Sequence, residues 1–284
     1  MKKFEYDAED DYFKIDPKFL SKGLDEAEKK KHFSIRIMAL DFRDDKLSFD
    51  IADLTSRTWI KRLILDDDLE VTAEEAKHLE RLTNLEELTV NQYAPLDFSK
   101  FKKLKELVLS NGTTLPGLEK VSSLKYLYLA NWKEEHLPKN IGDISATEIR
   151  ISASRKLSSI EPLFKLSNLK KLMLQDLPKI SIGKNVNKLK SLQELHVEQC
   201  GWTDFSELKS TTLEDLFVSK AQSLDFIKQL TRLNKLYFLD CVDGNMLPVL
   251  GHPTLKEIYF APQKKHYSHK EKFLQGQLQA RTRG

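Results

Sequence analysis

Residues 101–130 read FKKLKELVLSNGTTLPGLEKVSSLKYLYLA, and this stretch contains one short pattern twice. In the first copy an apolar residue, Leu104, is followed by Leu107 and Leu109, and in the second copy the same spacing begins at Leu124. Two apolar residues separated by one position lie on the same face of a β-strand, because successive side chains of a strand point to opposite faces. Each copy therefore predicts a short strand with one buried face.

The same pattern recurs along most of the chain, with a period of about 22 residues. Clear copies begin at Leu85, Leu104, Leu124, Leu169, Leu192 and Leu233. Degenerate copies have their middle apolar residue at Leu40, Leu63, Ile149, Leu216 and Ile258. Between copies, apolar residues at spacing three suit a short helical or 3₁₀ return to the next strand. One strand and one turn cannot bury an apolar face alone, so the units must stack and share a core.

On these residues the chain resembles leucine-rich-repeat proteins of the short-repeat class, such as bacterial internalins and repeat-built phosphatase regulatory subunits. The resemblance covers residues 33–263. It implies an α/β solenoid, or horseshoe, with a parallel inner sheet of about eleven strands and short helical outer segments. The family usually has Asn or Cys eight positions after the first apolar residue. Here that slot varies and includes Trp132, Cys200 and Cys241, so no unbroken asparagine ladder is expected.

The segments outside the repeats are expected to cap the array. We place an N-terminal cap at residues 1–32, the solenoid at 33–263 and a basic C-terminal cap or tail at 264–284. A helix is expected in Pro17–Lys31 and another in Ser268–Gln279. The first twelve residues carry two lysines against five acids, whereas residues 264–284 carry six basic residues against one acid. Solvated tails are favoured over head-to-tail association.

The composition excludes several classes of protein. The 284 residues include 46 Lys and Arg against 43 Asp and Glu, so nucleic-acid binding through bulk charge is not expected. Cys200 and Cys241 are the only cysteines, which favours a reducing compartment and predicts a cytoplasmic location. Acidic residues near the N-terminus precede any apolar run, and no uncharged apolar stretch reaches the length of a membrane span. Neither export nor membrane insertion is expected.

Residues that could support catalysis are scattered. The closest histidine pair, His266 and His269, has no third or fourth donor at motif spacing, so no metal site is predicted. The ten glycines do not form a phosphate-binding loop, and no nucleophile motif is visible. Cys200 and Cys241 occupy the same position of their repeats, which predicts buried turn residues. The expectation is a non-enzymatic protein without a cofactor.

The residue between the last two apolar residues of each copy must point away from the core. This outward slot holds Asp41, Ile64, Thr89, Val108, Tyr128, Arg150, Met173, His196, Phe217, Tyr237 and Tyr259. A solvated sheet face would be more polar, so the slot predicts a partner-binding surface on the concave face. The candidate partner-binding residues are Tyr126, Tyr128, Arg150, Met173, His196, Asp215, Phe217, Tyr237, Asp240 and Tyr259. An aromatic ladder that only stabilises the sheet is the alternative.

The predicted function is therefore a scaffold that binds a protein or peptide on its concave face and regulates or neutralises it. Asp215 and Asp240 are expected to select basic groups of that partner. A monomer is favoured, with no nucleic-acid or membrane partner. Two alternatives stay open: a bacterial toxin-immunity or effector protein, and a self-associating structural repeat protein.

Overall fold

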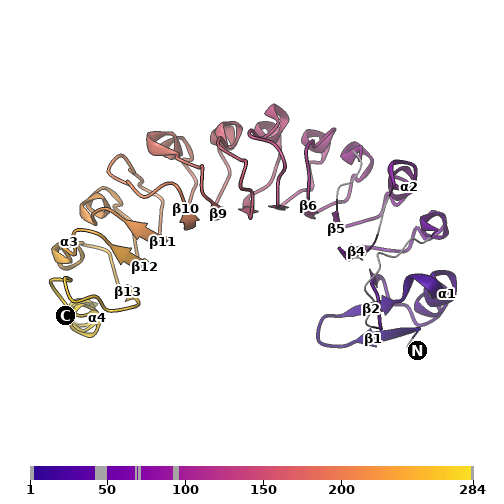
Figure 1. The fold of residues 1–284 in the computed structure, drawn as a ribbon, viewed down its shortest axis with the longest axis horizontal. Coiled ribbons are helices and arrows are strands. Elements are labelled where there is room, and N and C mark those ends of the chain that lie inside the picture. The colour runs from indigo at the N-terminus through magenta and orange to yellow at the C-terminus, as the bar shows by residue number, and fades with distance from the viewer. Residues whose placement is uncertain (1–2, 42–49, 68, 70–71, 92–95, 283–284) are drawn as a thin grey trace. The chain divides into compact units, whose positions relative to one another are not determined.

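Each repeat contributes one strand, and consecutive strands within a unit pair in parallel with matched register. The computed structural model describes residues 3–41, 50–67, 69, 72–91 and 96–282. The chain divides into a first unit, residues 1–131 with 143–145, and a second unit, residues 132–142 with 146–284. Within each unit the strands line one side and the helical segments the other, as Figure 1 shows. The predicted leucine-rich-repeat architecture is confirmed.

The first unit begins with a hairpin and continues with parallel strands. Its strands are β1 (Phe4–Asp7), β2 (Tyr12–Ile15), β3 (Ser34–Ile37), β4 (Arg62–Leu65), β5 (Glu87–Asn91), β6 (Glu106–Ser110) and β7 (Tyr126–Ala130). Its helical segments are η1 (Pro17–Phe19), α1 (Leu20–Lys29), η2 (Ile51–Leu54), α2 (Ala73–Leu79), η3 (Phe98–Lys100) and η4 (Leu118–Lys120). β1 pairs antiparallel with β2, and β2 pairs parallel with β3.

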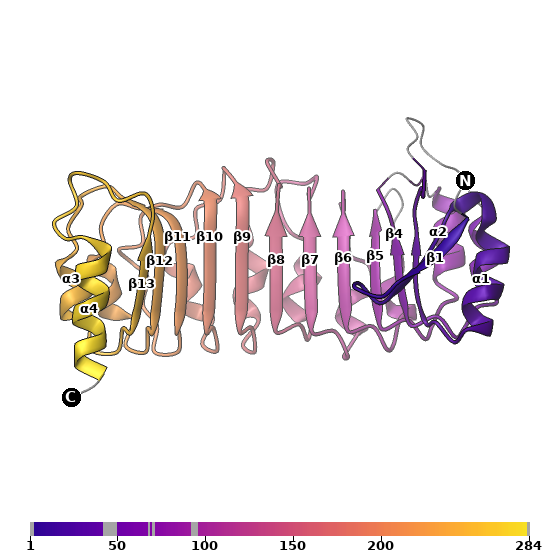
Figure 2. The ribbon, with the colours of Figure 1, turned by 90° about the horizontal axis from the view of Figure 1, so that it is seen from below.

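The second unit is parallel throughout, and Figure 2 shows its strands side by side. Its strands are β8 (Glu148–Ser152), β9 (Lys171–Leu177), β10 (Glu194–Cys200), β11 (Asp215–Ala221), β12 (Lys235–Cys241) and β13 (Glu257–Phe260). The remaining helical segments are η5 (Lys139–Asp143), η6 (Glu161–Lys165), η7 (Gly183–Lys188), η8 (Asp225–Gln229), α3 (Leu247–Gly251) and α4 (Glu271–Thr282). Residues 201–214, between β10 and β11, form no helix.

The core consists of the apolar residues that define the repeat. Leu107 aligns with Leu127 and Leu109 with Leu129, and all four side chains are fully buried. Burial of one leucine side chain contributes about 1.5–3 kcal/mol relative to exposure. Since every repeat adds such residues to the same layer, each repeat is stabilised by its neighbours rather than by its own contacts.

The first repeat differs from its prediction. Its strand is β3, and its buried residues are Ile35 and Ile37, which align with Leu63 and Leu65 of β4. Asp41 lies in a bend after the strand, so it does not occupy the outward slot, and Phe42 lies outside the described residues. Arg36 takes that slot. The two isoleucines are β-branched and pack well on a pleated sheet, which favours this register.

An asparagine ladder runs through the first unit. Asn131 donates its side-chain N–H to the Oδ1 of Asn111 at 2.6 Å, Asn111 donates to Asn91 at 2.9 Å, and Asn91 donates to Asp67 at 2.6 Å. The three asparagines lie one or two positions before the position at which the family pattern was expected, eight residues after the first apolar residue of the repeat. The ladder was therefore missed in the sequence. Asn111 and Asn131 have left-handed backbones, with φ of 57° and 51°, which asparagine tolerates.

Both predicted terminal helices are present, as α1 and α4. The described residues form thirteen strands, of which β3–β13 correspond to the eleven predicted repeats and β1 and β2 are additional. At the C-terminal end of the second unit, Gln275 and Glu271 of α4 accept hydrogen bonds from the backbone N–H groups of Ile258 and Phe260. These two donors of the edge strand β13 therefore have hydrogen-bond partners. The division into cap, solenoid and tail stays a prediction. No helix among the described residues is long and apolar enough to span a membrane.

Candidate functional site

One row of outward side chains crosses all six strands of the second unit. Each member is in register with the next, and each lies between two buried neighbours on its own strand. The row, called here the central row, consists of Arg150, Met173, His196, Phe217, Tyr237 and Tyr259. None of these residues is buried. The structure therefore brings together six of the predicted site residues on one sheet face.

The central row contains two aromatic contacts. The rings of His196 and Phe217 stack with centroids 4.1 Å apart and an interplanar angle of 4°, and the rings of Tyr237 and Tyr259 lie 6.3 Å apart at 48°. His196 Nε2 also lies 3.0 Å from a carboxylate oxygen of Glu198. Tyr259 is half exposed. The rings pack in two pairs and are still partly exposed to solvent, so the two interpretations of the ladder are compatible.

A second row, two residues earlier on each strand and therefore on the same face, carries charge. It consists of Glu148, Lys171, Glu194, Asp215, Lys235 and Glu257, in register from β8 to β13. Lys171 Nζ lies 3.1 Å from Glu194 and 4.0 Å from Glu148, and Lys235 Nζ lies 3.8 Å from Asp215. Of this charged row, only Asp215 is among the predicted site residues. The row is mixed, with an excess of two acids.

The excess negative charge is concentrated around Asp215. Partial burial raises the pKa of Asp215, the nearby carboxylates of Glu194, Glu214 and Glu257 raise it further, and Lys235 opposes them. Partial burial also raises the pKa of Tyr237, whose hydroxyl donates a 3.2 Å hydrogen bond to Glu257. A positively charged group near Asp215 would relieve this repulsion.

Asp240 already has partners within the chain. Lys264 Nζ lies 2.6 Å from its carboxylate, and the Tyr267 hydroxyl donates to it at 3.3 Å. Burial opposes ionisation of Asp240, but the hydrogen bond and charge of Lys264 outweigh that effect and lower its pKa. The Tyr267 hydroxyl also accepts the Cys241 backbone N–H at 3.1 Å, so Asp240 helps to hold the segment that follows β13.

The remaining predicted residues, Tyr126 and Tyr128, lie on β7 of the first unit. They align with Glu106 and Val108 of β6, and both are partly exposed. Arg36, on β3 of the same unit, was missed because the first repeat was assigned to Leu40 instead of Ile35. His32, Ile35 and Ile37 have the spacing of the repeat pattern, and this spacing could have identified β3 and the outward position of Arg36.

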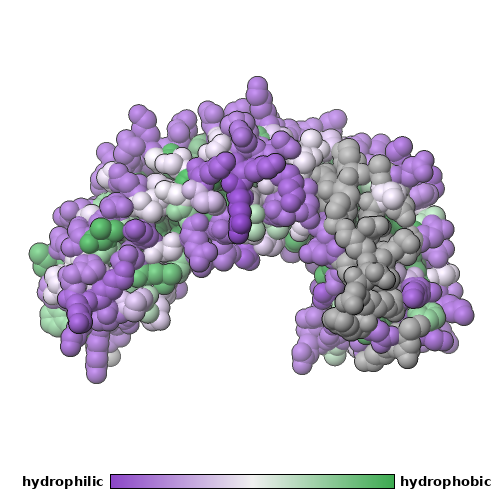
Figure 3. All heavy atoms as spheres, viewed as in Figure 1, coloured by the Kyte–Doolittle hydropathy of each residue, from purple (hydrophilic) through white to green (hydrophobic). Residues whose placement is uncertain are grey.

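Apolar surface is also present near the end of the second unit, where Figure 3 shows hydrophobic atoms among hydrophilic ones. Its exposed large apolar side chains are those of Leu239 and Tyr259 on the sheet, Val242 just after β12, and Leu247 and Phe273 on the helices α3 and α4. Leu239 follows Tyr237 by two positions on β12 and therefore points to the same face as the central row. This face thus extends beyond one row.

The cysteines do not form a reactive site. Burial raises the pKa of the Cys200 thiol to about 11 and that of Cys241 to about 12, so both are protonated at neutral pH. Cys241 is buried as predicted, whereas Cys200 is only partly buried. Both end a strand. Among residues 3–282, apart from the undescribed stretches, no three His, Cys, Asp or Glu side chains are placed to hold a metal ion.

No family model and no curated protein matches this sequence. Solved structures do match. A leucine-rich-repeat protein of Leptospira interrogans is 19% identical with a TM-score of 0.53, covering 83% of this chain and 63% of its own. InlP of Listeria monocytogenes is 16% identical with a TM-score of 0.50, covering 68% and 58%. TLR13, in its complex with ssRNA13, is 15% identical with a TM-score of 0.55, covering 82% and 41%. These similarities concern the fold alone.

Proposed function

Because this chain is a leucine-rich-repeat protein, we propose that it acts by non-covalent binding of a protein or peptide on the sheet face of its second unit. Folds of this type generally act as protein-binding scaffolds and are generally not catalytic. The observation that carries the proposal is the central row, in which partly exposed aromatic, apolar and basic side chains stand in register on six strands.

The composition of the central row suits an interface. Tyrosine, arginine, methionine and phenylalanine are enriched at the centres of protein interfaces, where they provide large contact areas. The stacked pair His196 and Phe217 is already ordered, so little side-chain entropy is lost when a partner covers it. A pre-formed face of this kind binds without rearrangement of the backbone.

The charged row indicates the chemistry of the partner. The acids around Asp215 repel one another; Lys235 opposes them at Asp215, and Lys171 pairs with Glu194. A lysine or arginine of the partner that reaches this position would gain the attraction of several carboxylates. Asp240 contributes less, because Lys264 already neutralises it. The expected ligand is thus a segment with apolar or aromatic residues and at least one basic side chain.

In this proposal the protein regulates or neutralises its partner by covering part of the partner's surface. The location is cytoplasmic, since the two cysteines are unpaired thiols. Tyr126 and Tyr128 form a further candidate contact on the first unit. Two alternatives compete with this proposal: neutralisation of a toxin in a bacterium, and self-association of the chain. Sizing at several protein concentrations separates them, because self-association gives a mass that rises with concentration.

The test compares two alanine variants of the second unit. Tyr237→Ala truncates the central row, and Leu247→Ala truncates an exposed apolar residue of α3, on the helical side. Proteins retained by the wild-type chain are identified, and the affinity of the purified partner is measured by calorimetry. We expect Tyr237→Ala to weaken binding by about 2 kcal/mol, roughly thirtyfold, and Leu247→Ala to leave it unchanged. Equal affinity of both variants would place the interface elsewhere.

A further inference from the structure

Three basic side chains stand close together on the sheet face of the first unit. Lys14 of β2 is in register with Arg36 of β3, and Arg62 lies on the adjacent strand β4. The three side chains are between 16% and 30% exposed. Arg62 also lies over the ring of Tyr12, with its guanidinium carbon 4.4 Å from the ring centroid, which fixes its position. The unit therefore presents an ordered basic cluster.

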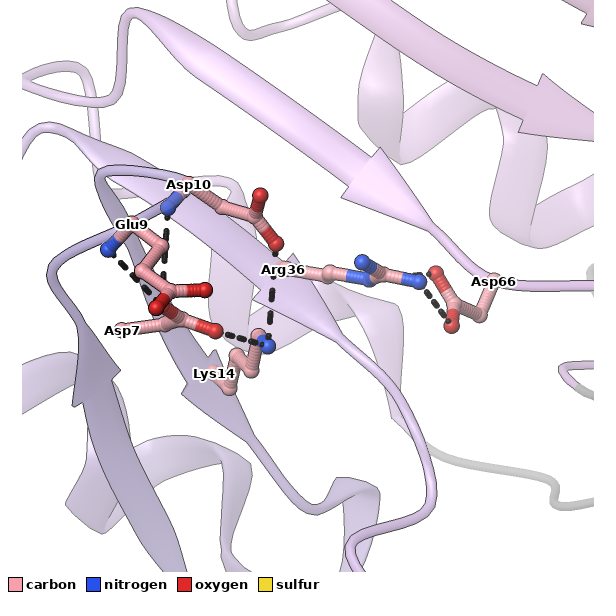
Figure 4. Close-up of polar contacts among 6 residues, drawn as sticks. All are labelled: Asp7, Glu9, Asp10, Lys14, Arg36 and Asp66. Carbon is pink, nitrogen blue, oxygen red and sulfur yellow. Dashed lines mark hydrogen bonds and ion pairs between the residues drawn. The ribbon is translucent and has the colours of Figure 1, made fainter.

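Carboxylates of the β1–β2 hairpin occupy part of this cluster. Figure 4 shows Lys14 between Asp7 and Asp10, with Nζ at 2.5 Å and 3.8 Å from their carboxylate oxygens. Asp11, from the same turn, lies 3.0 Å from Arg62. All three acids thus come from one five-residue segment of the chain, residues 7–11, which also contains Glu9.

Other carboxylates hold the arginines from within the sheet. Asp66, just after β4, accepts two hydrogen bonds of 2.9 Å from Arg36 (Figure 4). Glu87 of β5 accepts one of 2.8 Å from Arg62. These two acids do not belong to the hairpin, so they would keep the guanidinium groups oriented if the hairpin moved away. The cluster is therefore pre-organised without the hairpin acids.

The turn of the hairpin is exposed, whereas its strands are anchored. β1 is an edge strand that pairs with β2 at four positions, and Phe4 and Tyr6 stack on Phe13 and His32, but residues 8–11 of the turn are all exposed. The side chains of Asp10 and Asp11 are 56% and 64% exposed, and ion pairs at such exposure contribute little net stability. A ligand with several carboxylates could replace them, because it would restore the same charge-assisted hydrogen bonds.

We propose that Lys14, Arg36 and Arg62 form a docking site for an acidic peptide segment of a partner protein, and that Asp7, Asp10 and Asp11 mask it in the free protein. The present occupant is itself a peptide with closely spaced carboxylates, which defines the ligand class. Asp66 keeps Nε and Nη2 of Arg36, so a peptide carboxylate would take over the Arg62 Nη1 that Asp11 now holds and the Lys14 ammonium that Asp7 now holds. This site is independent of the proposed function, since it lies in the other unit and selects the opposite charge.

The test removes the mask without changing the site. The variant D7N/D10N/D11N is compared with E134Q/E135Q/D225N, which removes the same number of negative charges from exposed residues of the second unit. The probe is a fluorescein-labelled decaglutamate peptide, and its anisotropy is measured at about 20 mM salt, where screening is weak. We expect the unmasked variant to bind at least tenfold more tightly than the control. Equal binding by the two variants overturns the proposal.

Two further measurements test the assignment of the site. Adding R36Q/R62Q to the unmasked variant must abolish the gain in affinity, and a gain that survives this change overturns the proposal. An oligothymidylate of equal charge must gain less than the peptide, because an equal or larger gain would assign the site to nucleic acid.

Hydrogen exchange of the wild-type chain tests the displacement without any substitution. Saturating decaglutamate is expected to speed the exchange of the Glu9 and Asp10 backbone amides, which donate to Asp7 Oδ1 in the free protein, since the masking carboxylates are displaced. Unchanged exchange in the presence of bound peptide shows that the masking carboxylates are not displaced, which contradicts the proposed mask.

Discussion

Substitution of Asn111 tests whether the asparagine ladder stabilises the first unit. Asn111 Nδ2 donates to Asn91, which is 5% exposed, and Asn111 Oδ1 accepts from Asn131. In Asn111→Ala the buried Asn91 oxygen loses its donor, which costs about 1–3 kcal/mol. Asn131 is exposed and can bond to water instead. Alanine must also adopt the left-handed backbone of residue 111, at a cost of about 1 kcal/mol.

The expected loss for Asn111→Ala is therefore about 2–4 kcal/mol in the free energy of unfolding. The matched control is Asn111→Gly, which removes the same hydrogen bonds but accepts a positive φ without strain. Glycine should be the milder substitution, by about 0.5–1 kcal/mol after its larger unfolded-state entropy is included.

Urea unfolding followed by circular dichroism measures both variants. Hydrogen exchange then localises the effect, with faster exchange expected in β5, β6 and β7 and little change in the second unit. A loss below about 0.5 kcal/mol for Asn111→Ala would show that the ladder adds nothing beyond what water supplies. Equal losses of unfolding free energy for Asn111→Ala and Asn111→Gly would show that the left-handed backbone of residue 111 adds no cost for alanine.

Three other predictions concern the second unit. In Gly201→Ala the new methyl group would press into the Pro178 carbonyl oxygen, so the melting temperature should fall, by an amount equivalent to about 1–3 kcal/mol. Lys264→Gln removes the cation that lowers the pKa of Asp240. A lowered carboxyl pKa stabilises the fold fully above the pKa of the unfolded state, and this stabilisation is lost as the pH falls towards the pKa of the folded state. The stability difference between wild type and variant should therefore shrink as the pH falls from about 5 to 3, and a constant difference in urea midpoints would refute this. Cys200, with a pKa raised to about 11, should react with iodoacetamide much more slowly at pH 7.5 in the folded chain than in urea, as mass spectrometry can measure.

The outward positions of the central row could be predicted from the sequence. Phe217 lies between Leu216 and Val218, which are both fully buried, and Tyr237 lies between Leu236 and Phe238. The strand period of two leaves the middle side chain no other direction. This inference needs only local spacing, and it holds for all six strands of the second unit.

The first repeat could not be placed in this way. Both Ile35 with Ile37 and Leu40 with its neighbours satisfy the local spacing, so the sequence pattern is ambiguous there. Pairing of β3 with β2 on one side and β4 on the other selects the isoleucines. The error removed Arg36 from the predicted surface, and with it the basic cluster of the first unit.

By itself, the sequence determined the repeat, the number of repeated strands and the side chains that face away from the core, because these follow from a periodicity within single strands. Only the tertiary structure decided which charges meet. Lys171 neutralises Glu194, Lys264 neutralises Asp240, and Asp11 covers Arg62, although each pair is separated by at least one repeat. Such pairs depend on the register between strands and on the path of the terminal segments, and the spacing of leucines carries no information about either.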